Sequence, residues 1–93
     1  MTNTYDIEIN KEMVLSTCHV TDNEINGGVQ TSADEYSNRY LVNSVIEDLK
    51  ESTVESDYPN LIKLLQIAKA HNCRWLVLDC DGGVVEGLPT FDW

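Results

Sequence analysis

The sequence predicts a single α+β domain: a small sheet of three or four strands, mostly antiparallel, packed by one main helix over residues 59–71. Three observations predict this class. The chain has 93 residues, of which 42% are apolar, so it can bury one modest core but not two. A helical apolar period stands out once, between residues 61 and 68. Two short apolar runs, at residues 13–17 and 75–78, have the length and composition of strands.

The N-terminal part of the chain contains one clear strand among polar residues. Residues 1–12 are polar, and we expect a loose segment there. Met13–Thr17 is expected to form a strand, after which Thr21 or Asp22 has the side chain to cap a short helical turn. Residues 23–38 have no clear period, which indicates a loop with at most one turn of helix.

Residues 40–46 fit two interpretations. Tyr40, Val45 and Leu49 follow helical spacing, whereas the aromatic and β-branched content of the same stretch favours a strand. We expect a strand. Residues 47–58 hold five acids against one lysine and are expected to form an acidic connector.

The clearest element is the helix over residues 59–71. Its apolar residues recur at helical spacing: Leu61, Leu64, Leu65 and Ala68. Asp57 is the expected N-cap, and Pro59 suits the first turn because the N–H that proline lacks has no helical partner there. The helix should end near Asn72, where His71 is a favourable cation at the negative end of the helix dipole.

The C-terminal part is expected to be the packed scaffold. Trp75–Leu78 is predicted to be a buried strand, and Asp79–Gly83 the tight turn of a β-hairpin, because Asp and Gly favour turns. Val84–Val85 would then return beside that strand. Phe91 and Trp93 indicate a docked tail, since a frayed end would leave two large aromatic side chains in water.

The excess of acidic residues limits the classes of molecule that this chain can bind. Sixteen acids against six bases give a net charge of −10, which repels nucleic-acid phosphates and argues against direct nucleic-acid binding. The excess could simply serve solubility or adaptation to high salt, or it could imitate phosphates towards a protein with a basic surface. The densest stretch supplies the candidate partner-binding residues: Glu47, Asp48, Glu51, Glu55 and Asp57.

The sequence also points to a compartment. The N-terminus lacks a basic region followed by an apolar run, and no apolar run is long enough to cross a membrane. Three cysteines, an odd number, favour free thiols in a reducing environment. We therefore expect a cytoplasmic protein without a membrane partner.

Cysteine and histidine do not form the ligand pairs of a structural metal site. The five candidates are Cys18, His19, His71, Cys73 and Cys80. Structural zinc needs four ligands, usually in closely spaced pairs, which these spacings do not provide. We expect no metal and no cofactor.

An apolar strand followed by Asp79-Cys80-Asp81-Gly82 resembles the opening motif of the haloacid-dehalogenase-like phosphatases. In that family the first Asp is a nucleophile and the second a general acid or base, both beside magnesium. The context differs, because only twelve residues follow Asp81 and none of them is basic. We expect turn residues here, no catalytic residue and no enzymatic activity.

Three segments resemble one small uncharacterised bacterial family, the domain of unknown function 5983. They are an "STCHVT" opening in Val14–Thr21, a helix end "AKAHNC" within Tyr58–Cys73, and the closing "GLPTFDW" within Val85–Trp93. The chain departs from the family at Asn72, usually Gly, and at Cys18, often Ala. The resemblance implies no activity, but it implies an association with plasmids, phages and other mobile elements.

Together these features suggest a non-enzymatic acidic interaction protein of a mobile element. It would inhibit a host nucleic-acid-handling or defence complex, in the manner of anti-CRISPR or anti-restriction proteins, by phosphate mimicry. One alternative is an accessory module that binds a protein through its aromatic C-terminus, with incidental charge. The other is a small hydrolase that uses Asp79 and Asp81.

Overall fold

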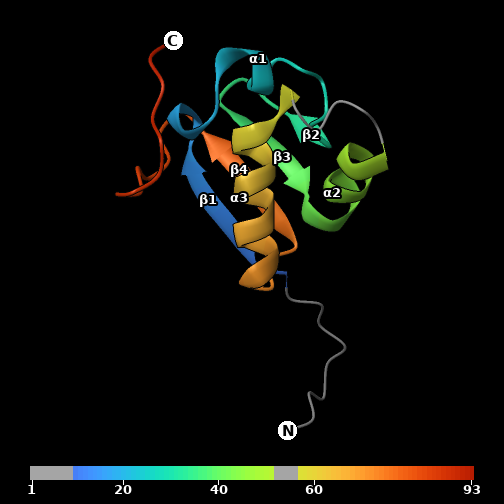
Figure 1. The fold of residues 1–93 in the computed structure, drawn as a ribbon. Coiled ribbons are helices and arrows are strands. Elements are labelled where there is room, and N and C mark those ends of the chain that lie inside the picture. The colour runs from blue at the N-terminus through green and yellow to red at the C-terminus, as the bar shows by residue number, and fades with distance from the viewer. Residues whose placement is uncertain (1–9, 52–56) are drawn as a thin grey trace, which may run out of the picture.

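The computed structural model describes residues 10–51 and 57–93. They form a four-stranded sheet with helices on one side (Figure 1). The elements in chain order are β1 (Glu12–Ser16), η1 (Thr17–His19), α1 (Asp22–Ile25), β2 (Ser32–Ala33), β3 (Ser37–Leu41), α2 (Val42–Glu51), α3 (Pro59–Ala70) and β4 (Trp75–Asp79). The expected α+β class is confirmed, with two main helices instead of one. Residues 1–9 of the expected loose segment lie outside the described residues, and Glu12 already belongs to β1.

The sheet has the strand order β1-β4-β3-β2. β1 runs parallel to β4, with Val14 opposite Val77, whereas the β4–β3 and β3–β2 pairs are antiparallel. The predicted mostly antiparallel sheet is therefore confirmed. β4 is the last strand in the sequence, yet it lies in the interior of the sheet, between β1 and β3.

The predicted β-hairpin after β4 is wrong. Both edges of β4 are occupied, by β1 and β3, so Val84–Val85 has no place beside it. The chain turns at Asp79, whose carbonyl accepts the Gly82 N–H, and crosses to the outer edge of β1. There the Gly83 carbonyl accepts the Ser16 N–H at 2.9 Å.

The strand expected over residues 40–46 is corrected from residue 42 onward, and residues 47–51 of the expected connector belong to a helix, while residues 52–56 lie outside the described residues. β3 ends at Leu41, the last residue paired with β4, and α2 begins at Val42. The stretch from 42 to 51 is helical because its apolar residues form one buried stripe: Val42, Val45, Ile46 and Leu49. Much of the acidic segment therefore lies on a helix.

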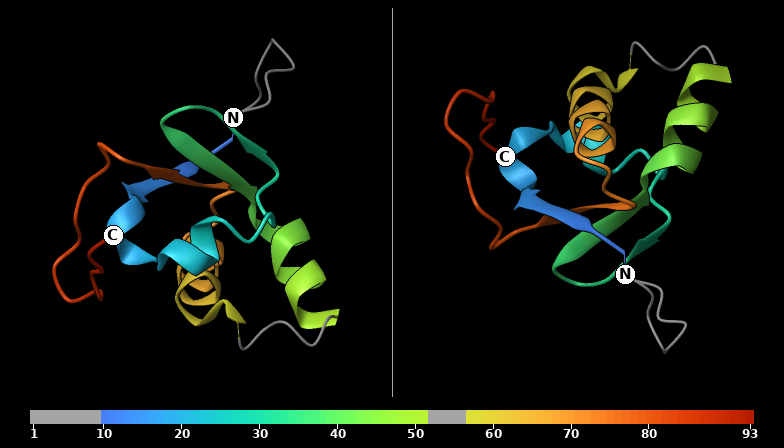
Figure 2. Two further views of the ribbon diagram at one scale, coloured as in Figure 1. Left: turned by 90° about the horizontal axis from the view of Figure 1, so that it is seen from above. Right: turned by 90° about the horizontal axis from the view of Figure 1, so that it is seen from below.

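The core lies between the sheet and the helices. Leu15, Tyr40, Leu76 and Leu78 point from the sheet into this layer, and the apolar stripes of α2 and α3 cover them. The stripe on α3 is the predicted one: Leu61, Leu64, Leu65 and Ala68. Figure 2 shows the helices gathered on this side of the sheet.

The opposite face of the sheet carries a mixed set of side chains. The Arg39 guanidinium lies 4.9 Å from the Trp75 ring centroid and forms an ion pair with Glu12 at 3.1 Å. Val77 is buried on this face, whereas Val14 is 50% exposed.

No helix of the described residues is long and apolar enough to span a membrane.

The N-cap of α3 differs from the prediction. Tyr58, and not Asp57, is the N-cap, and its side chain makes no capping hydrogen bond. The Asn60 and Leu61 N–H groups at the start of α3 donate instead to Glu24 Oε2, at 2.8 and 2.9 Å. A carboxylate from α1 thus caps α3 across the fold, and at the other end Asn72 adopts a φ of 60° just after the helix.

Candidate functional site

The acidic residues expected to bind a partner lie on separate elements. Glu47 and Asp48 are exposed on α2, and Asp57 is exposed just before α3. The side chain of Glu51, and the whole of Glu55, lie outside the described residues. The described members of the set are thus divided between two helical segments.

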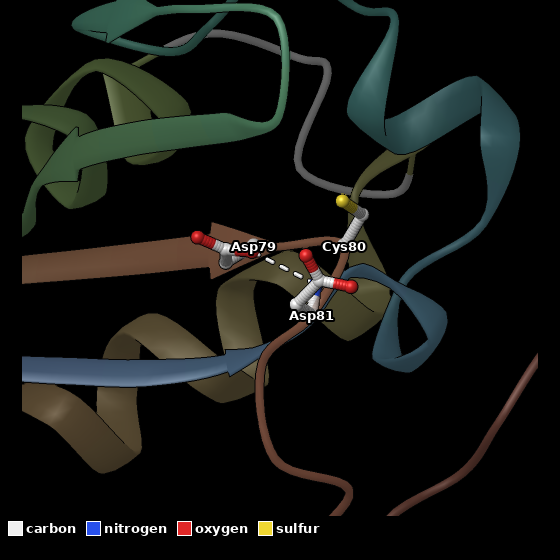
Figure 3. A group of neighbouring side chains, drawn as sticks. All are labelled: Asp79, Cys80 and Asp81. Atoms are coloured by element: carbon white, nitrogen blue, oxygen red, sulfur yellow. Dashed lines mark hydrogen bonds between the residues drawn. The ribbon is translucent and has the colours of Figure 1, made fainter.

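A second group of acids lies where β4 ends beside the turn between β2 and β3. We name Asp34, Asp79 and Asp81 the acidic end. The Cys80 N–H donates to the Tyr36 carbonyl at 3.0 Å, which joins the two segments. The Asp81 N–H donates to Asp79 Oδ1 at 2.8 Å (Figure 3). This contact closes the turn predicted for the two aspartates.

The carboxylate of Asp34 is held in place by its own turn. Its Oδ1 accepts the N–H groups of Tyr36 and Ser37 at 2.8 and 2.9 Å, and its Oδ2 accepts the Ser37 hydroxyl at 3.1 Å. Hydrogen bonds from these two N–H groups and the hydroxyl lower the pKa of Asp34, because they stabilise the charged form. Asp34 therefore presents a fixed negative charge on an exposed surface.

Asp79, Cys80 and Asp81 bring three possible metal-ligand atoms within 4.8 Å of one another. Desolvation, followed by the charges of Asp81 and Asp79, raises the pKa of the Cys80 thiol. A thiol that stays protonated near neutral pH is a poor nucleophile and a poor metal ligand. The end of β4 and the turn after it therefore place two carboxylates and a thiol close together.

A family model matches residues 12–93 and is described as "Family of unknown function (DUF5983) C-terminal domain". The chain belongs to this family. The match extends the resemblance from the separate motifs to nearly all described residues. No curated protein and no solved structure matches the chain. Since the family is of unknown function, membership assigns no activity to any residue.

Two segments that carry the DUF5983 resemblance lie side by side. The opening segment forms β1 and η1, and the closing segment runs along it in Figure 1. We name residues 82–93 the C-terminal strap. The Phe91 N–H donates to the Cys18 carbonyl at 2.8 Å, and the Trp93 indole N–H donates to the Val20 carbonyl at 2.9 Å. These bonds dock the tail, as predicted, although Trp93 remains 55% exposed.

His19 is a residue that sequence reasoning missed. From the sequence it is one of five candidate metal ligands, but in the structure its ring is buried and bonds to the strap. Its Nδ1 lies 2.8 Å from the Pro89 carbonyl, and its Nε2 accepts the Val85 N–H at 2.9 Å. The two partners are 70 and 66 residues away along the chain, so no local pattern could have revealed them.

Proposed function

We propose that this chain is a non-enzymatic interaction protein of a mobile genetic element that binds a basic protein surface through its acidic end. In this proposal Asp34, Asp79 and Asp81 occupy positions on a host nucleic-acid-handling or defence complex that phosphates otherwise occupy. The chain would then inhibit that complex in the manner of anti-CRISPR or anti-restriction proteins.

The observation that carries the proposal is the fixed geometry of the acidic end. Asp34 and Asp79 each accept backbone N–H groups of their own turns, and the Cys80 N–H joins the two turns. Carboxylates held in this way lose little conformational entropy when they meet a partner. By comparison, Glu47 and Asp48 lie on the exposed face of a helix, where no hydrogen bond is described for either side chain.

Two further properties support an electrostatic partner. The net charge of −10 attracts a basic surface at long range and repels competing nucleic acid. The family resemblance implies a mobile-element setting, in which inhibitors of host defence are useful to the element. A partner recognised in this way would release the chain as salt rises.

The strap favours a second candidate, an accessory module that binds a protein through its C-terminus. Trp93 is held by the Val20 carbonyl yet is 55% exposed, and Val85 beside His19 is 41% exposed. A fixed aromatic side chain with an exposed surface is typical of an anchor in a protein interface. In this case the charge would be incidental and binding would depend weakly on salt.

A pulldown from host lysate, with the bound proteins identified by mass spectrometry, tests the proposal. The protein should retain its partner at about 50 mM salt and lose most of it at about 500 mM, because the charges are then screened. Added duplex DNA or RNA should displace the chain, since mimicry places both on one groove. Binding that survives high salt and is not displaced by either nucleic acid would favour the accessory module.

Two variants with the same net charge locate the surface. D34N/D79N/D81N removes the acidic end, and E47Q/D48N/D57N removes three exposed acids elsewhere, so both have a net charge of −7. We expect at least tenfold weaker binding for the first variant, and a smaller loss for the second. Equal losses would mean that total charge matters and not the acidic end.

A further inference from the structure

The imidazole of His19 is the one histidine ring in the described residues that is buried, with 1% of the residue exposed. Both ring nitrogens bond to the backbone of the C-terminal strap. Nε2 faces the Val85 N–H at 2.9 Å, and Nδ1 faces the Pro89 carbonyl at 2.8 Å. His19 therefore holds the strap at two points four residues apart.

These two partners decide the protonation state of the ring. A backbone N–H can only donate, so Nε2 must carry a lone pair. A backbone carbonyl can only accept, so the proton must lie on Nδ1. The docked strap is thus compatible with the neutral ring in the tautomer whose proton lies on Nδ1. Protonation of His19 would place a second N–H against the Val85 N–H and break that contact.

The strap depends strongly on such contacts. Val84 is 65% exposed and Trp93 is 55% exposed, so apolar burial is limited, and Leu88 is the strap residue that packs on the core. Other contacts include hydrogen bonds from Ser16, Phe91 and Trp93. Loss of the contacts to His19 therefore removes a large share of what holds residues 85–89.

We propose that His19 is a pH-sensitive latch that holds the C-terminal strap when neutral and releases it when protonated. Release uncovers the outer edge of β1, where Ser16 otherwise donates to Gly83. The latch is separate from the acidic end and does not rest on the function proposed above. It makes the strap a conditional cover over part of the protein surface.

Several other titratable side chains lie on the segments around His19. The titratable side chains on the surrounding segments are Cys18 on η1, Asp22 and Glu24 on α1, Asp79, Cys80 and Asp81 in the turn after β4, and Glu86 and Asp92 on the strap. Carboxylic acids as a class titrate below the range from about pH 5.5 to 7.5, and thiols as a class titrate above it. A change within this window therefore reports on histidine.

Nuclear magnetic resonance of the unmodified protein tests the tautomer directly. Ring ¹⁵N shifts at pH 7.5 should show the His19 proton on Nδ1 and a bare Nε2. A proton on Nε2 would overturn the proposal. This measurement needs no variant, so it stands even where a substitution at His19 disturbs folding.

Amide hydrogen exchange tests the release. Protection factors of the Val85 and Phe91 amides, corrected for the intrinsic effect of pH, should fall about tenfold from pH 7.5 to 5.5, because the reference pKa of histidine side chains in general, about 6.5, lies within this range. The Leu64 and Leu65 amides in α3 serve as the reference and should not change. Unaltered protection of Val85 and Phe91 would contradict the latch.

Two variants complete the test. H19Q keeps a donor and an acceptor but cannot take up a proton in this range, so its strap protection should not depend on pH. H71Q removes the exposed histidine that follows α3 and should keep the full tenfold response. A pH response that persists in H19Q, or disappears in H71Q, would assign the effect to another group and overturn the proposal.

Discussion

Glu24 is a buried carboxylate that joins two helices. It is 1% exposed, yet five groups donate to it: the Thr21 N–H and hydroxyl, the Asn60 N–H and side-chain amide, and the Leu61 N–H. The same residue completes the capping box of α1 and caps α3. One side chain therefore satisfies helix-terminal N–H groups of two elements.

Burial acts to raise the pKa of Glu24, but the hydrogen bonds from Thr21, Leu61 and Asn60 outweigh it and hold the pKa below the ordinary value. A lowered pKa in the folded state stabilises the fold above the ordinary value, and this stabilisation is lost as pH falls towards the folded-state value. The contribution of Glu24 should therefore persist at neutral pH and decline below about pH 4.

Glu24→Gln should lower the free energy of unfolding by about 2–4 kcal/mol at pH 7, because an amide nitrogen then faces donors that need an acceptor. Urea titrations of both proteins measure the difference. It should shrink as pH falls below about 4, since only the parent loses the ionised form. Asp22→Asn, an exposed acid on the same helix, is the control and should cost less than about 1 kcal/mol. A pH-independent difference would show that Glu24 is not ionised in the fold.

Gly82 is required by a close approach of two backbones. A Cβ at this position would lie 2.5 Å from the carbonyl carbon and oxygen of Leu15, where the chain crosses to β1. The backbone cannot give way as a flexible side chain would. The neighbouring Gly83 has nothing within 4 Å of its Cβ position.

Gly82→Ala should therefore destabilise the protein by about 1–3 kcal/mol, and Gly83→Ala by less than about 0.5 kcal/mol. Thermal unfolding of the two variants measures this. Equal effects would mean that the loss comes from backbone freedom and not from contact with Leu15.

Several hydrogen bonds dock the C-terminal strap on one short segment, residues 16–20. The strap ends the chain after Pro89 with Phe91 and Trp93, and their bonds reach Cys18 and Val20. Removal of residues 88–93 would leave the Cys18 and Val20 carbonyls without these partners and uncover the core beside Leu88.

Deletion of residues 88–93 should lower the free energy of unfolding by about 2 kcal/mol, which corresponds to a fall in Tm of roughly 10 °C for a domain of this size. Differential scanning calorimetry measures it. Trp93→Phe keeps an aromatic ring at this position but loses the indole N–H donor, so the Tm of this variant should fall by less than that of the deletion. An unchanged Tm on deletion would instead favour the strap as a partner-binding segment.

The turn after β4 tests the hydrolase interpretation. In the turn interpretation Asp79 and Asp81 carry charge and close the backbone, and they do not hold magnesium. Millimolar magnesium should therefore leave the Tm of the parent unchanged, and D79N/D81N should respond in the same way. A rise of several degrees that is lost in the variant would reinstate the metal-dependent alternative.

At the scale of the whole molecule, the described acids belong to several surfaces. Glu47 and Asp48 lie on α2 and Asp57 lies just before α3, while the acidic end combines residues from two turns. A protein partner could use either surface, and the choice between them can be measured.

Changing Glu47, Asp48, Glu51, Glu55 and Asp57 to Asn or Gln lowers the net charge from −10 to −5. If this stretch is the contact surface, partner binding should weaken about tenfold and depend less on salt, with stability within about 1 kcal/mol of the parent. Binding at several salt concentrations measures both. If this variant binds like the parent while D34N/D79N/D81N does not, the acidic end is the contact surface.

Local patterns in the sequence determined the elements whose burial follows a simple period. The stripe of Leu61, Leu64 and Leu65 predicted α3, and the apolar runs near Leu15 and Val77 predicted β1 and β4. Residue type left Thr21 and Asp22 as alternative caps, and Thr21 is the N-cap of α1. Each of these depends on neighbours within a few residues, which is the range over which helix and strand periods act.

The tertiary structure alone decided the strand order and the long-range contacts. A central β4 leaves no edge for a hairpin strand, Glu24 caps α3 in place of Asp57, and His19 binds the strap. The residues in these contacts are not separated by a short, regular spacing along the chain. The helical start at Val42 was likewise decided by packing against α3, since β-branched residues there suited a strand as well. Local periodicity selects the elements, but which buried donor meets which acceptor depends on how the elements pack.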